Sequence, residues 1–199
     1  MDLRQAFLDD HAHLHSAVIS GAGLSMEDNL CQGLSADQLR ARPLGLNSIA
    51  WLLWHVTRFE DVVVNVVLQD RPDVLAREGW ATRLGVETRQ IGTGSSDAEV
   101  DDFGQRVDPE ALRAYRAAVG RATRAWAAEA DWSALDAVPD VAGRLARAPA
   151  TIGERAAWVQ ALWSSRSGHG LLALPVIGHS YLHVGEARVT RARLGARVP

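Results

Sequence analysis

Apolar residues in this chain recur every three or four positions over long stretches, whereas alternation with a period of two is hard to find. The first spacing gathers apolar side chains on one face of a helix, and the second would be needed for a half-buried strand. We therefore expect an all-α protein. With 47% hydrophobic residues, the 199-residue chain has enough apolar material for a single domain over residues 1–199 with a buried core.

Four long amphipathic helices are predicted from the apolar stripes and from the residues that start and stop helices. They are expected at about residues 3–18, 47–70, 108–126 and 175–195. Pro175 is placed in the first turn of the last helix, because proline is tolerated there and breaks a helix elsewhere. The pattern fits an antiparallel four-helix bundle with extra short helices, a fold that can build a site from side chains on facing helices.

The connections between these helices also carry signals. Two capping boxes, Ser35 with Gln38 and Thr151 with Glu154, predict the starts of shorter helices. Residues 75–108 are glycine-containing and mostly polar, which is long for a loop, so we expect a functional cover or a partly mobile segment with only short helical turns. Within it, the GTGSS stretch at residues 92–96 is predicted to be a flexible cover, since it lacks the lysine of a phosphate-binding loop.

The charged residues exclude several functions. The 21 basic residues are all arginine and are balanced by 24 acidic residues, for a net charge of −3. No basic field is available to attract nucleic acid or an anionic membrane. The absence of lysine excludes Schiff-base chemistry, lysine-anchored pyridoxal phosphate and a lysine-bearing phosphate loop.

A single cysteine, Cys31, excludes an internal disulfide and any cysteine-cluster metal site, and suits a reducing compartment. We expect Cys31 to be a small core residue rather than a nucleophile. No apolar run is long enough to span a bilayer, so the expected location is the cytoplasm.

Three histidines interrupt predicted inward faces. His179 and His183 are one turn apart on the last helix, near Val176, Leu182 and Val189. Two histidines at this spacing also occur by coincidence on the exposed face of a helix. If these two are buried, however, each imidazole needs a hydrogen-bond partner or a metal.

His55 shows the same anomaly between Leu52 and Phe59 on the second helix, where the alternative is a core histidine bonded to the backbone. Three neutral histidines on two facing helices would leave a coordination position open, as in a catalytic zinc-type site.

Two segments, NSIAWLLWHVTRFED at residues 47–61 and GHSYLHVGE at residues 178–186, resemble the DinB-like four-helix-bundle superfamily. The resemblance extends over almost the whole chain in the order and spacing of motifs. It implies that His55, His179 and His183 bind a divalent metal, usually zinc or nickel, with open positions facing a cleft. Relatives include mycothiol-dependent maleylpyruvate isomerases and bacillithiol or mycothiol S-transferases, in which the metal activates a low-molecular-weight thiol.

Several polar residues are candidates for supporting roles. Glu186 lies one turn beyond His183 and is predicted to orient an imidazole or to pair with an arginine, the alternative being a solvated charge. Arg58 and Arg188 are candidates for binding acidic groups of a cofactor or substrate at the rim. Glu60, Asp61 and Glu186 are candidate proton acceptors if water is the nucleophile.

The remaining histidines are expected to play no part in the metal site. His11, His13 and His15 are predicted to form a solvated cluster on the edge of the first helix, although one of them could rim the cleft. His169 is expected in an exposed glycine-flanked loop.

The resemblance implies a metal-dependent S-transferase that joins a mycothiol-type thiol to a small electrophile. A metal-dependent hydrolase and a noncatalytic metal or small-molecule binding protein are the alternatives. The expected partners are therefore small molecules, a thiol and an electrophilic substrate, and the sequence leaves monomer and homodimer both open.

Overall fold

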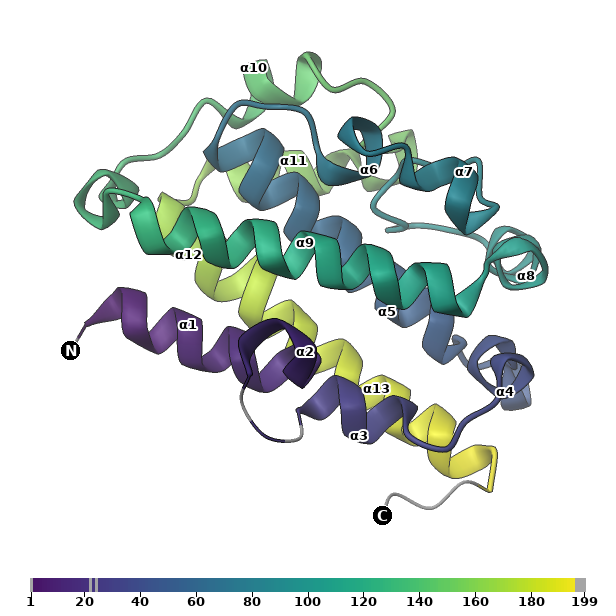
Figure 1. The fold of residues 1–199 in the computed structure, drawn as a ribbon. Coiled ribbons are helices and arrows are strands. Elements are labelled where there is room, and N and C mark those ends of the chain that lie inside the picture. The colour runs from purple at the N-terminus through teal and green to yellow at the C-terminus, as the bar shows by residue number, and fades with distance from the viewer. Residues whose placement is uncertain (1, 22, 24, 196–199) are drawn as a thin grey trace.

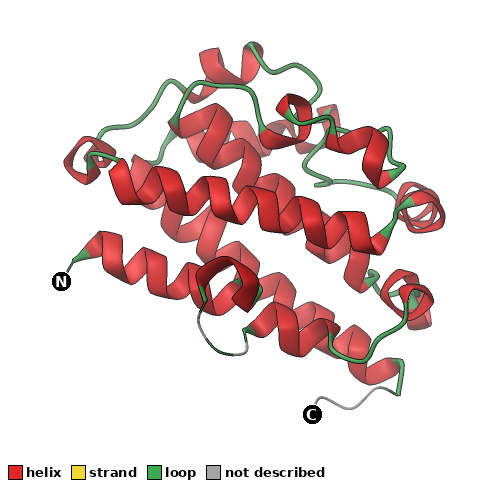
Figure 2. Cartoon of the chain, in the orientation of Figure 1, coloured by secondary structure: helices red, strands yellow, loops and turns green. Residues whose placement is uncertain are grey.

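The computed structural model describes residues 2–21, 23 and 25–195, and among these it contains helices and loops but no strand (Figure 2). Four long helical segments form a bundle (Figure 1). They are α1 (Leu3–Leu14), α5 (Ile49–Asp61) continued by the π-helical η2 (Val62–Leu68), α9 (Pro109–Glu129), and α13 (His179–Arg193) preceded by α12 (Gly168–Leu171) and the π-helical η5 (Leu172–Gly178). The predicted all-α bundle is confirmed.

The side-chain contacts define the directions of these helices. Near the start of α5, Asn47 contacts Glu186 late in α13, and near its end Phe59 contacts His179 at the start of α13, so this pair is antiparallel. Helices α1 and α9 are likewise antiparallel, whereas α5 and α9 run in the same direction (Figure 1). The long segment between α5 and α9 returns the chain to the other end of the bundle and makes this parallel pair possible.

Helix α5 is the centre of the molecule. All thirteen of its residues are buried, and it packs against α9, α13, η5, α4 (Ala36–Arg40) and α8 (Asp97–Arg106). Ser48 caps its start by accepting a hydrogen bond from the Trp51 amide. Polar side chains on this helix therefore lie inside the protein whichever way they point.

Local capping signals are confirmed at two helices and fail at one. Ser35 and Gln38 form the predicted capping box, and Asp108 caps α9, which has a proline in its first turn. The expected box at Thr151 is wrong, because its hydroxyl donates to the Ala148 carbonyl and the next helix, α11 (Ala157–Ser164), begins after a short 3-10 turn.

The prediction that the last helix starts at Pro175 is also wrong. The helical path begins at Gly168 and passes through Pro175 inside η5. The π-type pairing of this segment accommodates a residue that has no amide hydrogen, while Leu171, Leu172 and Val176 bury their side chains around it.

The first and last stripes are less buried than predicted. Val18 is 73% exposed because α1 ends at Leu14 and the chain turns before α2 (Ala17–Ser20). On α13, Leu182 and Val189 are 69% and 51% exposed. The apolar faces predicted for the first and last helices are therefore only partly buried.

Residues 75–108 contain more helix than the expected short turns, since α8 (Asp97–Arg106) has ten residues. The other short elements are α3 (Met26–Cys31), α4 (Ala36–Arg40), α6 (Val74–Arg77), α7 (Trp80–Leu84), α10 (Val141–Ala146), η1 (Pro43–Gly45), η3 (Trp132–Asp136) and η4 (Glu154–Ala156). Cys31 is buried, as predicted for a core residue, and burial raises the pKa of its thiol to about 12. In the part of the chain that the structure describes, none of the helices has the length and apolar character needed to cross a membrane.

Candidate metal centre

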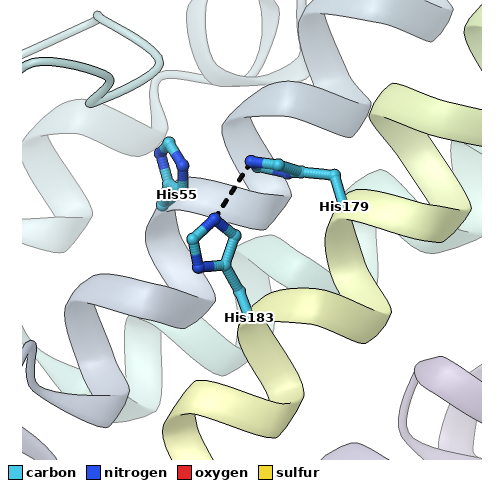
Figure 3. A group of neighbouring side chains, drawn as sticks. All are labelled: His55, His179 and His183. Carbon is cyan, nitrogen blue, oxygen red and sulfur yellow. Dashed lines mark hydrogen bonds between the residues drawn. The ribbon is translucent and has the colours of Figure 1, made fainter.

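His55 on α5 and the pair His179 and His183 on α13 come together in the bundle (Figure 3). The three ring centroids are 4.5 to 4.8 Å apart, with interplanar angles of 61°, 78° and 83°. One nitrogen from each ring lies within 4.8 Å of the other two. Three imidazoles tilted against one another in this way can direct their lone pairs toward a common point, as metal ligation requires.

Hydrogen bonds fix the tautomers of two of these rings. His55 Nδ1 donates to the Ile91 carbonyl oxygen at 2.5 Å, and His183 Nδ1 donates to Glu186 Oε2 at 2.8 Å. A neutral imidazole that donates through Nδ1 carries a lone pair on Nε2. The acceptors on the Nδ1 side thus leave Nε2 of both residues available as ligand atoms, which is the usual arrangement around a protein-bound metal.

Burial keeps His55 and His179 neutral. Burial lowers the pKa of His55 to about 3, with a further contribution from His183. Burial also lowers the pKa of His179 to about 2, again with contributions from the other two histidines. Only the neutral form can bind a metal, so both rings are in the binding form at neutral pH.

Glu186 and Asn47 support the site from behind. Glu186 Oε1 accepts a hydrogen bond from Asn47 Nδ2 at 2.8 Å while its other oxygen contacts His183. Thr190 Oγ1 donates to the Asn47 carbonyl at 2.9 Å, which ties α13 to the residue just before α5. The contact between Glu186 and an imidazole is the one predicted from the sequence.

Aromatic rings enclose the histidines on two sides. Trp51 stacks on His55 with centroids 4.8 Å apart, and Phe59 stacks on His179 at 3.9 Å. Trp51 is buried and also lines the adjacent cavity. Trp54, in contrast, is a core residue packed against Phe103 and Tyr115.

A cavity of about 570 Å³ opens beside the three histidines. Residues 92–95 form part of its wall, so the long connection does cover one side of the site. Gly92 has a φ of +86°, and a Cβ at this position would lie 3.2 Å from His55 Nδ1. A glycine is therefore needed here both for the backbone conformation and for the close approach to the histidine.

Arg58 and Arg188 do not have the rim positions expected for them. Arg58 is fully buried, and its guanidinium donates to Asp61 at 3.1 Å, to Asp73 at 2.8 Å and to Tyr115 at 3.0 Å. Arg188 is exposed and is not among the residues that line the cavity. Asp61 is occupied in the same buried network as Arg58, one helical turn away. It accepts hydrogen bonds from the Val74 and Leu75 amides of α6 and from the Tyr115 hydroxyl of α9.

Glu60 belongs to a second buried cluster, which the sequence reading missed. His11 Nε2 and His15 Nε2 donate to its two oxygens at 2.9 and 2.7 Å. Burial would raise the pKa of Glu60, but His15 and His11 hold it well below its usual range. The expectation that His11 and His15 are solvated is wrong, and so is the placement of Glu60 at the metal site.

This second cluster has a different geometry from the first. The rings of His11 and His15 are stacked 4.1 Å apart at an angle of only 13°. Parallel rings direct their lone pairs side by side and not toward one point. The arrangement therefore fits a pair of hydrogen bonds that fasten α1 to α5, which we call the Glu60 clamp.

The other two histidines are outside both clusters. His13 is exposed, as expected. His169 is half-buried in α12 beside Trp132, with ring centroids 5.7 Å apart, and the expectation of an exposed loop is wrong.

A signal for the clamp exists in the sequence. His11 lies four residues after Phe7 and three before Leu14, so it interrupts an apolar stripe in the same way as His55. The same argument that singled out His55 would have placed His11 inside the protein.

Comparison with protein families identifies the chain. The family model described as the DinB superfamily matches residues 25–161, which is more than half of the sequence. The chain belongs to the DinB superfamily. The matched range contains His55 and ends before His179 and His183.

A solved structure has a similar overall fold over nearly the whole chain. The protein, described as a conserved protein of locus from Enterococcus faecalis, has a TM-score of 0.66 and 18% sequence identity, and the match covers 98% of this chain and 99% of that one. At this identity the likeness concerns the fold alone. A comparison with curated proteins finds no match.

Proposed function

We propose that this DinB superfamily member is a metal-dependent S-transferase, with a zinc or nickel ion held by His55, His179 and His183. The observation that carries the proposal is the hydrogen bonding of the rings. His55 and His183 each donate through Nδ1 to an acceptor outside the group, so each carries a lone pair on Nε2, and Nε2 of His183 faces Nε2 of His179. The set supplies three nitrogen ligands and leaves room for one more ligand from the cavity.

Thiol chemistry suits the surroundings of this site better than water activation. A bound divalent ion would lower the pKa of a coordinated thiol enough to supply a thiolate without a separate base. Water starts from a much higher pKa than a thiol, so a hydrolase would gain more from a carboxylate that accepts the proton, but Glu60 and Asp61 are committed to the clamp and to Arg58. Glu186 is bonded to His183 and Asn47.

The protein's own residues would position the reactants. Glu186 and the Ile91 carbonyl hold two of the imidazoles in fixed orientations, so the ligand set needs little rearrangement. Trp51 and Phe59 shield the histidines from water. The cavity provides space for an electrophile next to the position where the thiol sulfur would be presented.

Metal analysis of the purified protein followed by adduct formation tests the proposal. Protein loaded with zinc or nickel is incubated with a panel of electrophiles and with mycothiol, bacillithiol, glutathione or no thiol, and products are identified by mass spectrometry. We expect about one metal per chain and thiol adducts that disappear in His183→Ala but persist in His13→Ala. His13 is exposed and lies outside both histidine clusters.

Two results would replace the transferase with another function. Products that form equally well without thiol would favour the hydrolase. Metal binding with no product above the His183→Ala background would favour a noncatalytic binding protein.

A further inference from the structure

The cavity beside the three histidines is lined mainly by apolar and aromatic side chains. Besides the histidines, Asp97 is the only charged residue among its lining residues, and no arginine reaches it. Asp97 is itself paired with Arg42, whose guanidinium lies 2.5 Å from a carboxylate oxygen. The volume of about 570 Å³ is within the range of small-molecule sites.

The mouth of this cavity is also apolar. Nine large apolar side chains are exposed among the described residues, and four of them line this one cavity: Trp158, Leu162, Leu174 and Leu182. They come from α11, η5 and α13, so three separate elements contribute to one apolar surface, which we call the apolar rim. Scattered exposed apolar residues need no explanation, whereas a group around a cavity is typical of a binding site.

Arginines near the mouth are not available for an acidic ligand. Arg155, whose Cβ lies 2.9 Å from where a Cβ on Gly94 would be, is paired with Glu99. Arg42 is paired with Asp97 and Asp101. A carboxylate entering the cavity would lose its hydration without gaining a cationic partner from the lining, which is unfavourable.

We infer that the cavity binds a neutral molecule whose aromatic or alkyl portion packs against the apolar rim, and that its side-chain lining, without a bound ion, discriminates against anionic ligands. This inference names the class of ligand for the site. Only the identification of that ligand with the electrophile rests on the proposed function. The occupant is a small molecule, because the rim leads into a concave space that ends at the three histidines.

Binding of a matched pair of fluorescent probes to the metal-free full chain tests this inference. N-phenyl-1-naphthylamine is neutral, and 1-anilinonaphthalene-8-sulfonate adds a negative charge to a similar ring system. We expect the neutral probe to bind at least ten times more tightly than the sulfonate. Leu182→Asn should weaken binding of the neutral probe about tenfold, whereas Val189→Asn should leave it unchanged. Val189 is a suitable control because it is exposed on the same helix and does not line the cavity.

Light scattering on the same samples excludes a competing use of the apolar rim. A stable dimer that Leu182→Asn dissociates, together with no binding of the neutral probe, would show that a second copy covers the rim and would overturn the inference. Equal affinity for the two probes, or an equal loss in Val189→Asn, would overturn it as well.

The two proposals can fail separately. Metal-free binding needs neither ion nor thiol, so a probe that binds as expected while no thiol adduct forms would remove the transferase and keep the apolar ligand site. Thiol adducts formed by the loaded protein without discrimination between the probes would do the reverse.

Discussion

The Nε2 atoms of His179 and His183 lie 3.1 Å apart, while Nδ1 of His183 donates to Glu186 on the next turn of the same helix. One carboxylate thus determines which nitrogen of His183 faces His179. Because Glu186 also accepts from Asn47, the orientation of the ring depends on contact between α13 and the start of α5. The proposed metal ligands are therefore positioned by the packing of two helices.

Metal binding should raise the thermal stability of the protein. With ion at about 100 times its Kd, stability is expected to increase by about 2.7 kcal/mol. Differential scanning fluorimetry of chelator-treated protein, with and without added zinc or nickel, measures this shift. His179→Ala should abolish it and His13→Ala should retain it; a shift that survives in His179→Ala would remove this histidine from the ligand set.

Glu186→Gln should weaken metal affinity by about tenfold to a hundredfold, since a neutral amide orients and polarises His183 less effectively than a carboxylate. Titration with a competing chromophoric chelator measures the affinity. Glu129→Gln, at an exposed site at the end of α9, is the matched control. Identical affinities for the two variants would show that the contact between Glu186 and His183 does not support the metal.

Gly92→Ala should lower both stability and metal affinity. Its φ of +86° is unfavourable for alanine, by about 1–2 kcal/mol, and the added Cβ would press on His55. Gly33→Ala separates the two effects, because Gly33 also has a positive φ, of +74°, but has no atom near the added carbon. Urea unfolding should show losses in both variants, whereas chelator competition should show weaker metal binding in Gly92→Ala alone.

Glu60→Gln should destabilise the protein without changing its metal content. The amide offers one acceptor in place of two, so one buried imidazole of the clamp loses its partner, at a cost of about 1–3 kcal/mol. Urea denaturation and elemental analysis of the same preparation measure the two quantities. Loss of metal in folded Glu60→Gln would mean that the clamp, and not the first cluster, holds the ion.

Stability of the metal-free protein should fall as the pH drops below about 6.5. In the unfolded chain His15, His55 and His179 take up protons near their ordinary pKa of 6.5. In the folded protein burial delays protonation to about pH 3 for His15 and His55 and to about pH 2 for His179. The stabilising contribution is therefore complete above pH 6.5 and is lost progressively toward pH 3, by about 1.4 kcal/mol per pH unit for each histidine.

Urea unfolding between pH 7.5 and 4.5 measures this dependence. His55→Gln should show a shallower slope, because it removes one of the three groups. An unchanged slope would indicate that His55 protonates as easily in the folded protein as in the unfolded chain.

The sequence by itself determined the helices and identified the first histidine cluster. Apolar periodicity and capping residues are local properties, so Ser35, Ser48 and Asp108 mark helix starts regardless of what the helices later contact. His55 stood out for the same reason, since a polar residue on an apolar stripe is visible without knowledge of the fold. Its juxtaposition with His179 and His183 followed from the family resemblance and is present in the structure.

Tertiary packing alone decided which polar neighbours accompany the site. Because every residue of α5 is buried, periodicity cannot tell which face of that helix meets α1, α9 or α13. Arg58 donates hydrogen bonds to Asp73 and Tyr115, and Glu60 accepts hydrogen bonds from two histidines of α1, so neither side chain lies at the metal centre. The position of Pro175 inside η5 and the exposure of Leu182 also depend on tertiary packing. The free-energy cost of a missing amide hydrogen at Pro175, and of an exposed apolar side chain at Leu182, is set by the surrounding elements and not by the local sequence.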